Sequence, residues 1–184
     1  MTNFHSQTDE QLIALLQTNS DLAIDWIFRR YYPMCRKAAL RVLKDEHLAE
    51  DITQDVFLEL WKKRGERQIN IALKAYLRRS VMNRCLNYIR DKKMAFDDED
   101  KLPEWPSTAS DALSDLETGE LEQSLQKAID ELPERCRIIF TLSRFEDLKY
   151  QQIADKLEIS IKTVENQMSK ALRVIRKALT EREQ

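Results

Sequence analysis

The stretch "LEISIKTVENQMSKALRVIRKAL", from Leu157 to Leu179, joins a tight corner to a long amphipathic segment. A helix-turn-helix needs a small residue before the corner and an apolar residue after it that locks the second helix, and Ala154 and Val164 lie at those places. Ser160 is well placed to cap the second helix. The apolar side chains of that helix share one side: Ile161, Val164, Met168, Ala171, Leu172, Ile175 and Leu179. This pattern predicts a helix-turn-helix.

The other side of the same helix is polar, and its residue types change along its length. Lys, Thr, Glu, Asn and Ser crowd the first two turns, and basic residues follow. Side chains of the first group can bond base edges in a major groove. The Lys and Arg residues that follow them can neutralise phosphates. A solvated polar side would have the same periodicity, but the gradient favours DNA recognition. We call these residues the reading face: Ser160, Lys162, Thr163, Glu165, Asn166, Ser169, Lys170 and Arg173.

Glu158 occupies a corner position that often carries Gly, because the backbone there can require a positive φ. If that geometry is kept, Glu costs about 1 kcal/mol relative to Gly. A slightly different turn is the alternative.

Composition predicts an all-α protein of two small domains. The 184 residues include only 2 Gly and 4 Pro, and 34% are charged, which favours amphipathic helices over sheets. No apolar run approaches a membrane span and no signal peptide is evident, so we expect a cytoplasmic protein. Cys35, Cys85 and Cys136 are widely spaced and should be buried rather than bind a metal.

Three parts are predicted along the chain. Residues 1–94 and 121–184 carry helical periodicity, and the second of these segments contains a helix start at Pro133. Residues 95–120 lack that periodicity and should form an acidic linker.

The net charge of −2 argues against a protein that coats nucleic acid through bulk electrostatic attraction, because such binding needs a surplus of Lys and Arg.

Within the first part, four helices are expected. Thr8 and Gln11 form a capping-box pattern for the first, and Ser20 is a candidate cap for the second. Pro33 should kink or split that second helix. The third and fourth helices should cover about residues 47–63 and 73–90.

The third helix combines an apolar stripe with an opposite side that is acidic. The stripe contains Leu48, Ile52, Val56 and Leu60, flanked by Ala49 and Phe57. We call the opposite side the acidic face: Asp51, Gln54, Asp55 and Leu58. Carboxylates repel phosphates, so this face suits a protein contact better than a nucleic-acid contact, with a solvated surface as the alternative. Glu59 fits this division poorly, because it projects near the apolar arc.

The fourth helix carries a surface that suits unpaired nucleic-acid strands. We call it the basic-aromatic face: Tyr76, Arg79, Ser80, Asn83, Asn87 and Arg90. An aromatic ring, amides and guanidinium groups can stack on a base, bond its edge and neutralise the backbone. Tyr76 and Asn83 as ordinary surface and cap residues are the alternative. The opposite, apolar side contains Leu77, Val81, Cys85, Tyr88 and Ile89.

The order of these parts resembles the bacterial sigma factors of the extracytoplasmic-function group, which retain only regions 2 and 4. "AEDITQDVFLELWKK" is similar to region 2.2, and "AYLRRSVMNRCLNYIRDKK" is similar to regions 2.3 and 2.4. The segment from "ELPERCRIIFTL" to "ALRVIRKAL" is similar to region 4. The resemblance spans nearly the whole chain, and three motifs in this order are highly specific.

The resemblance implies two partners, core RNA polymerase and promoter DNA. It implies that the acidic face binds the β′ clamp helices and that the helix of "CRIIFTL" seats on the β flap. It places Asn83 near the pocket for a flipped −10 base, with the loop from Arg64 to Asn70 forming the rest, and places the reading face on the −35 element. The linker would thread toward the active-site and RNA-exit channels, and an anti-sigma factor would restrain the protein.

Three other classes of protein fit the sequence less well. A stand-alone helix-turn-helix regulator would leave the acidic face unexplained. An enzyme has no candidate constellation, because His5 and His47 are the only histidines and no phosphate loop or metal-ligand spacing occurs, so we expect no cofactor. A structural adaptor would not need the ordered polar residues of the reading face.

Overall fold

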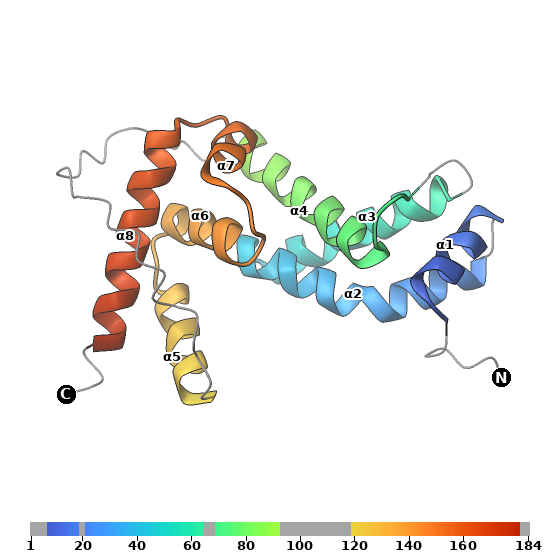
Figure 1. Ribbon diagram of the computed structural model, residues 1–184, viewed down its shortest axis with the longest axis horizontal. Helices are drawn as coiled ribbons and strands as arrows, with labels where there is room; N and C mark the ends of the chain where they lie inside the picture. The colour runs from blue at the N-terminus through green and yellow to red at the C-terminus, as the bar shows by residue number, and fades with distance from the viewer. Residues whose placement is uncertain (1–6, 19–20, 65–68, 93–118, 181–184) are drawn as a thin grey trace. The chain divides into compact units, whose positions relative to one another are not determined.

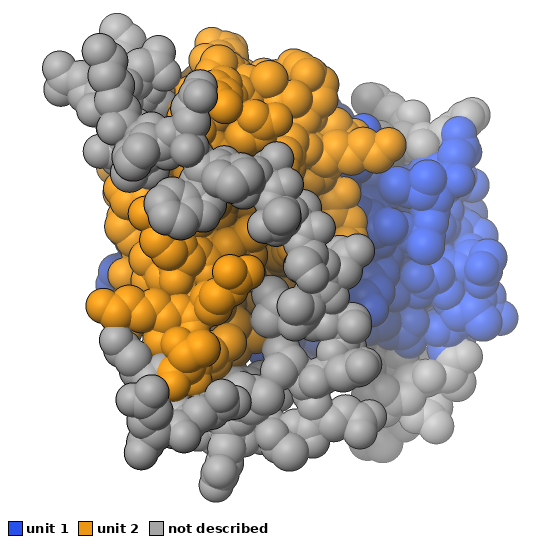
Figure 2. Space-filling view, turned by 60° about the vertical axis from the view of Figure 1, so that its left-hand side comes forward, with its two compact units in different colours: residues 1–88 blue, residues 89–184 orange. Residues whose placement is uncertain are grey.

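The computed structural model describes residues 7–18, 21–64, 69–92 and 119–180, with side chains from residue 124 onward in the last range. Within these ranges every regular element is an α-helix (Figure 1), which confirms the all-α prediction. The chain divides into two compact units, residues 1–88 and 89–184 (Figure 2). The predicted linker, residues 95–120, lies outside the described residues except for its last two, which begin a helix.

The first unit holds four helices: α1 (Asp9–Gln17), α2 (Asp21–Leu43), α3 (Glu46–Lys62) and most of α4 (Leu73–Asp91). The second unit holds the other four: α5 (Gly119–Asp130), α6 (Glu134–Arg144), α7 (Tyr150–Leu157) and α8 (Ile161–Thr180). No helix in the described part of the chain is long and apolar enough to cross a membrane.

The predicted capping box begins α1. Thr8 Oγ1 accepts a hydrogen bond from the backbone of Gln11 at 3.3 Å, and Gln11 Oε1 accepts one from the backbone of Thr8 at 2.9 Å. Asp9 then accepts a hydrogen bond from the Tyr31 hydroxyl, which ties α1 to α2. Ser20, the predicted cap of α2, lies outside the described residues.

Pro33 lies inside α2, which continues from Asp21 to Leu43 without a break. A proline in a helix interior removes a hydrogen bond and costs about 3 kcal/mol. Burial on both sides of it, of Ile27 before and Cys35 after, offsets this cost and keeps the helix whole. Of the two outcomes predicted for Pro33, a kink or a split, the split does not occur.

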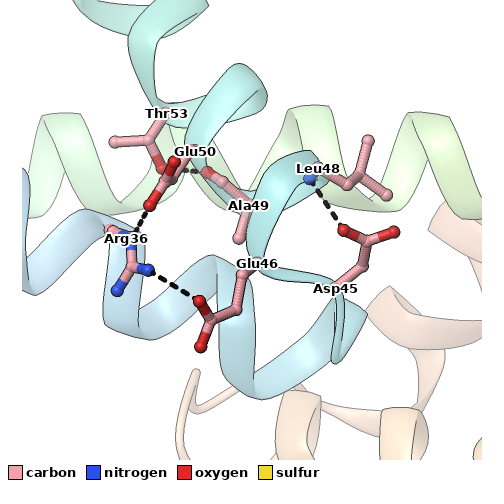
Figure 3. Close-up of polar contacts among 7 residues, drawn as sticks. All are labelled: Arg36, Asp45, Glu46, Leu48, Ala49, Glu50 and Thr53. Atoms are coloured by element: carbon pink, nitrogen blue, oxygen red, sulfur yellow. Dashed lines mark hydrogen bonds and ion pairs between the residues drawn. The ribbon is translucent and has the colours of Figure 1, made fainter.

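Polar contacts fix the corner between α2 and α3 (Figure 3). Asp45 Oδ1 accepts a hydrogen bond from the backbone of Leu48 at 2.9 Å and so caps α3. Arg36 Nε contacts Glu50 at 2.8 Å, and Arg36 Nη2 contacts Glu46 at 3.5 Å. These contacts hold the start of α3 against the middle of α2.

The cysteines are buried in the cores, as predicted. Cys35 of α2 and Cys85 of α4 lie in the first unit, and Cys136 of α6 lies in the second. Burial raises the pKa of the Cys35 thiol to about 12, so this thiol stays protonated at neutral pH.

The second unit has an unusual core helix, because α6 is buried on every side from Cys136 to Leu142. This helix begins directly after Pro133, as predicted. Cys136 Sγ donates to Gln167 Oε1 of α8 at 3.0 Å. Thr141 Oγ1 is fully buried and has no hydrogen-bond partner among the described residues. Such a group weakens the core that holds α8.

Candidate functional site

The helix-turn-helix consists of α7, the corner after it, and α8. Glu158 has φ 57° and ψ 43°, so the left-handed geometry is kept although the residue is not Gly. Ala154 and Val164 are buried on the two sides of the corner, as the motif requires. Ser160 Oγ accepts a hydrogen bond from the backbone of Thr163 at 2.9 Å, which confirms Ser160 as the cap of α8.

Most of the reading face is open to solvent. Lys162, Glu165, Ser169 and Arg173 are exposed, and Asn166 and Lys170 are partly exposed. Thr163 differs, because its hydroxyl lies 2.8 Å from Ser160 Oγ and belongs to the cap. The structure therefore presents one continuous polar surface, with one of its predicted readers engaged within the helix.

The apolar side of α8 differs from the periodicity prediction at both edges. Ile161, the first residue of α8, is 43% exposed. Gln167, which was not predicted to be buried, is 6% exposed and receives the Cys136 thiol. Val164, Met168, Ala171 and Ile175 are buried as predicted, whereas Leu172 and Leu179 are partly buried.

All four residues of the acidic face are exposed along α3, and they line an open groove of about 780 Å³. The groove has a second wall, because α2 contributes residues that sequence reasoning missed: Ile24, Asp25 and Phe28. Phe28 stacks on Tyr32 with ring centroids 4.5 Å apart and meets Phe57 edge-on at 5.1 Å. Aromatic rings thus line part of the groove, and carboxylates lie around them.

The three carboxylates of the groove differ in their ionic partners. Asp25 is paired with Arg29 one turn along α2, at 2.9 Å. Asp55 is paired with Arg84 of α4, at 3.4 Å. Asp51 is exposed and has no ion-pair partner in the described part of the chain. Exposed carboxylates beside aromatic rings can bind a basic, amphipathic protein segment.

Glu59, which fits the acidic face poorly by periodicity, has a structural explanation. Its carboxylate is half-buried and lies 2.8 Å from Arg84 and 3.0 Å from Lys63. Two cations therefore accompany this acid at the edge of the apolar side of α3, where an unpaired charge would be costly.

The basic-aromatic face lies along α4. Arg79 and Asn87 are exposed, and Tyr76, Ser80, Asn83 and Arg90 are partly exposed. Arg90 contacts its neighbour Asp91 at 3.1 Å. The opposite side is buried at Leu77, Val81, Cys85 and Ile89, as predicted, and Tyr88 is partly buried. The face is thus presented on a helix that is packed along its other side.

The loop predicted to complete the −10 pocket, Arg64 to Asn70, is described only at its two ends. Residues 65–68 lie outside the described residues. Arg64 lies over the Trp61 ring at 5.0 Å and contacts Asp21 at 3.3 Å, although its buried Nε has no partner among the described residues. The beginning of the loop is thus fixed to α3 and to the start of α2.

The segment predicted to seat on the β flap, "CRIIFTL", has no open apolar surface. Its residues, Cys136 to Leu142, are all buried. A helix buried on every side acts as a core element. A flap contact made by these side chains stays a prediction.

Comparison with protein families gives two matches along the chain. Residues 27–94 match the model of Sigma-70 region 2, and residues 122–175 match the model of Sigma-70, region 4. Together they span about two thirds of the chain. The first match contains the acidic face and the basic-aromatic face, although Ile24 and Asp25 of the groove precede it, and the second match contains the reading face.

Curated relatives extend this likeness over the chain. The RNA polymerase sigma-H factor of Pseudomonas aeruginosa is 26% identical over 182 residues, covering 94% of each chain. The ECF RNA polymerase sigma factor SigW of Bacillus subtilis is 26% identical over 159 residues, covering 82% of this chain and 83% of SigW. A solved structure of CnrH, in complex with the cytosolic domain of CnrY, shares the fold: its TM-score is 0.50 at 18% identity, covering 95% of this chain and 99% of CnrH. The chain belongs to the sigma-70 family, in the extracytoplasmic-function (ECF) group of RNA polymerase sigma factors.

Proposed function

We propose that this sigma factor brings core RNA polymerase to promoters that it selects through a −35 and a −10 element. One observation carries the proposal: both sigma regions occur in one chain, and each presents exposed polar residues on a packed helix. Residues 1–94 are assigned to region 2, residues 121–184 to region 4, and residues 95–120 to the connection between them.

The proposed docking site for polymerase is the groove. Its exposed carboxylates repel phosphates and attract basic side chains, while Phe28 and Leu58 supply exposed apolar surface. This chemistry fits the β′ clamp helices, the partner that the family resemblance implies for the acidic face. Asp51 is the strongest candidate for a direct ionic contact, since it has no cation partner within the described residues.

The two DNA contacts are assigned to different helices. The reading face of α8 enters the major groove of the −35 element, where Lys162, Glu165 and Asn166 read base edges and Arg173 binds phosphate. The basic-aromatic face of α4 receives the unpaired nontemplate strand of the −10 element. Extruding one base toward Asn83 would help to open the duplex, because binding offsets the few kcal/mol lost on unstacking.

The charge of the chain supports a function that depends on polymerase. With a net charge of −2, the protein lacks the surplus of cations that drives nucleic-acid binding by bulk attraction. Each DNA face alone should therefore bind weakly. Once polymerase holds both faces on one duplex, the second contact gains a high effective concentration.

Sigma factors are initiation factors without catalytic activity, and we assign none to this chain. Its place of action is the cytoplasm, where promoters and polymerase meet. An anti-sigma factor, implied by the family resemblance, is the proposed restraint.

Run-off transcription with purified core polymerase and a library of promoter sequences tests this function. Addition of the chain should produce transcripts from a subset of templates that share −35 and −10 sequences. If no template responds although the chain binds the polymerase, the proposal is wrong. A stand-alone regulator would instead bind its operator tightly without polymerase and would start no transcript.

A further inference from the structure

Arg84 of α4 reaches across to α3 and contacts two carboxylates there. Its Nη2 lies 2.8 Å from Glu59 Oε2, and its Nη1 lies 3.4 Å from Asp55 Oδ2. One guanidinium group can bridge two acids because its donors form a planar fork. These contacts join the helix of the basic-aromatic face to the helix of the acidic face.

The two contacts of Arg84 are unequal. The Glu59 side chain is 29% exposed and is also held by Lys63 at 3.0 Å. The Asp55 side chain is 60% exposed, has the longer contact, and lines the groove. Glu59 is therefore the firm anchor of Arg84, whereas Asp55 is the contact that an incoming partner can reach.

Arg84 also borders the basic-aromatic face on its own helix. At about 100° per residue, Arg84 lies roughly 40° around the helix axis from Ser80 and roughly 60° from Asn87. A change in how Arg84 is held thus acts directly beside the residues assigned to the −10 element.

We propose that Arg84 is a positioning residue that competes with polymerase for Asp55, and that this competition couples polymerase docking to the position of α4. This inference rests on the proposed function. In the free chain, Arg84 neutralises Asp55 and ties α4 to the groove. A basic side chain of the docking partner takes over this carboxylate, and Arg84 then holds α4 through Glu59 alone.

The first test is the affinity of the full-length chain for core polymerase, measured by fluorescence titration at low and high salt. Arg84→Met removes the competing charge and keeps an unbranched apolar stem. Since exposed ion pairs contribute little, the expected gain is about twofold to fivefold tighter binding at low salt, diminishing at high salt. Arg84→Lys keeps a cation but lacks the planar fork that reaches both acids, so it should give a smaller gain than Arg84→Met. Circular dichroism melting establishes that each variant is folded.

A double-mutant cycle assigns the gain to the pair. In an Asp55→Asn background, Arg84→Met should give no further gain, because the contested charge is already absent. Arg29→Met is the matched control: it frees Asp25, another acid of the groove, and Arg29 has no hydrogen bond or ion pair with α4 among the described residues. Its effect on affinity should persist in the Asp55→Asn background.

A second readout reports on α4. At saturating polymerase, Arg84→Met should lower the permanganate reactivity of the −10 element, because α4 is then no longer held through Glu59. The factor of this loss should be no larger than the factor by which polymerase affinity increases. Arg29→Met should leave this reactivity unchanged.

Two results overturn the inference: an Arg84→Met chain that is folded yet binds polymerase no tighter than the wild type, or a gain that persists without Asp55. A failure of the proposed function looks different. In that case the wild type does not bind polymerase, or Asp51→Asn and Asp55→Asn both bind as tightly as the wild type does.

Discussion

The reading face of α8 and the groove beside α3 differ in the number of helices that build them. All residues of the reading face come from one helix and its cap, with buried residues along the opposite side. The groove needs α2 as well as α3, because Ile24, Asp25 and Phe28 form its second wall. A surface on one helix follows from the period of that helix, whereas a groove depends on how two helices pack.

The two surfaces also differ in how their charges are held. Lys162, Glu165 and Asn166 of the reading face have no side-chain partner in the described part of the chain, so they can meet DNA directly. In the groove, Asp25 and Asp55 already have internal cations, and a partner must compete for them. We therefore expect a strong, base-dependent contact on α8. In the groove, we expect contacts whose strength depends on whether the carboxylate already has an internal cation.

The largest effect is expected on the reading face. Asn166→Ala should cost about 1 to 3 kcal/mol at particular −35 base pairs, because an amide that bonds a base edge is lost. The measurement is holoenzyme binding to a set of −35 variants at fixed salt. The control is Arg176, an exposed basic residue further along the same helix that suits a phosphate contact, so Arg176→Ala should weaken binding about equally for all sequences. If Asn166→Ala weakens binding equally for all −35 sequences, Asn166 does not read a base.

In the groove, Asp51→Asn should weaken polymerase binding by about 1 kcal/mol, the upper range for an exposed ionic contact. Asp25→Asn should cost less, because Arg29 already neutralises Asp25 in the free chain. Titration of fluorescent chains with core polymerase measures both. An equal loss for the two variants would show that an internal ion pair does not weaken the contact of a groove carboxylate with polymerase.

Thr141→Val tests whether the core under α8 is separable from its surface. The change replaces a fully buried hydroxyl without a hydrogen-bond partner among the described residues by a methyl group of similar shape. Stability should rise by about 1 kcal/mol, since an unsatisfied buried polar group is removed. Denaturant unfolding measures the gain, and −35 discrimination should not change. A loss of stability would indicate that the hydroxyl is satisfied in solution.

The corner gives the smallest effect. Glu158→Gly should stabilise the second unit by roughly 0.5 kcal/mol, because relief of the left-handed strain exceeds the entropic cost of Gly. Asp147→Gly, at φ 53°, is the matched change and should gain less, since Asp tolerates this conformation better than Glu. Thermal unfolding compares the two. A gain for Asp147→Gly that equals or exceeds that for Glu158→Gly would contradict this explanation.

Elements with strong local signals were predictable from the sequence. The capping box at Thr8, the helix start at Pro133 and the cap at Ser160 depend on neighbouring residues, and the structure has each of them. The exposure of the acidic face followed from the period of a single helix.

Features made by packing between helices could not be predicted in this way. Gln167 is polar, yet it is buried because Cys136 of another helix donates to it. Pro33 does not split α2, because burial on both sides outweighs its local cost. Phe28 carried a usable signal, as an aromatic residue beside the Asp25 and Arg29 pair, but its place in the groove required the position of α3.

The central claim is that the two DNA faces select a promoter only when polymerase holds them together. Its most direct test is to titrate one promoter fragment, and a scrambled fragment of equal length, with the chain alone and with the chain bound to core polymerase at the same salt concentration. Weak binding with little preference by the free chain, and strong preference for the promoter in the complex, is the predicted result. Tight, promoter-specific binding by the free chain, unchanged when polymerase is added, would contradict the claim.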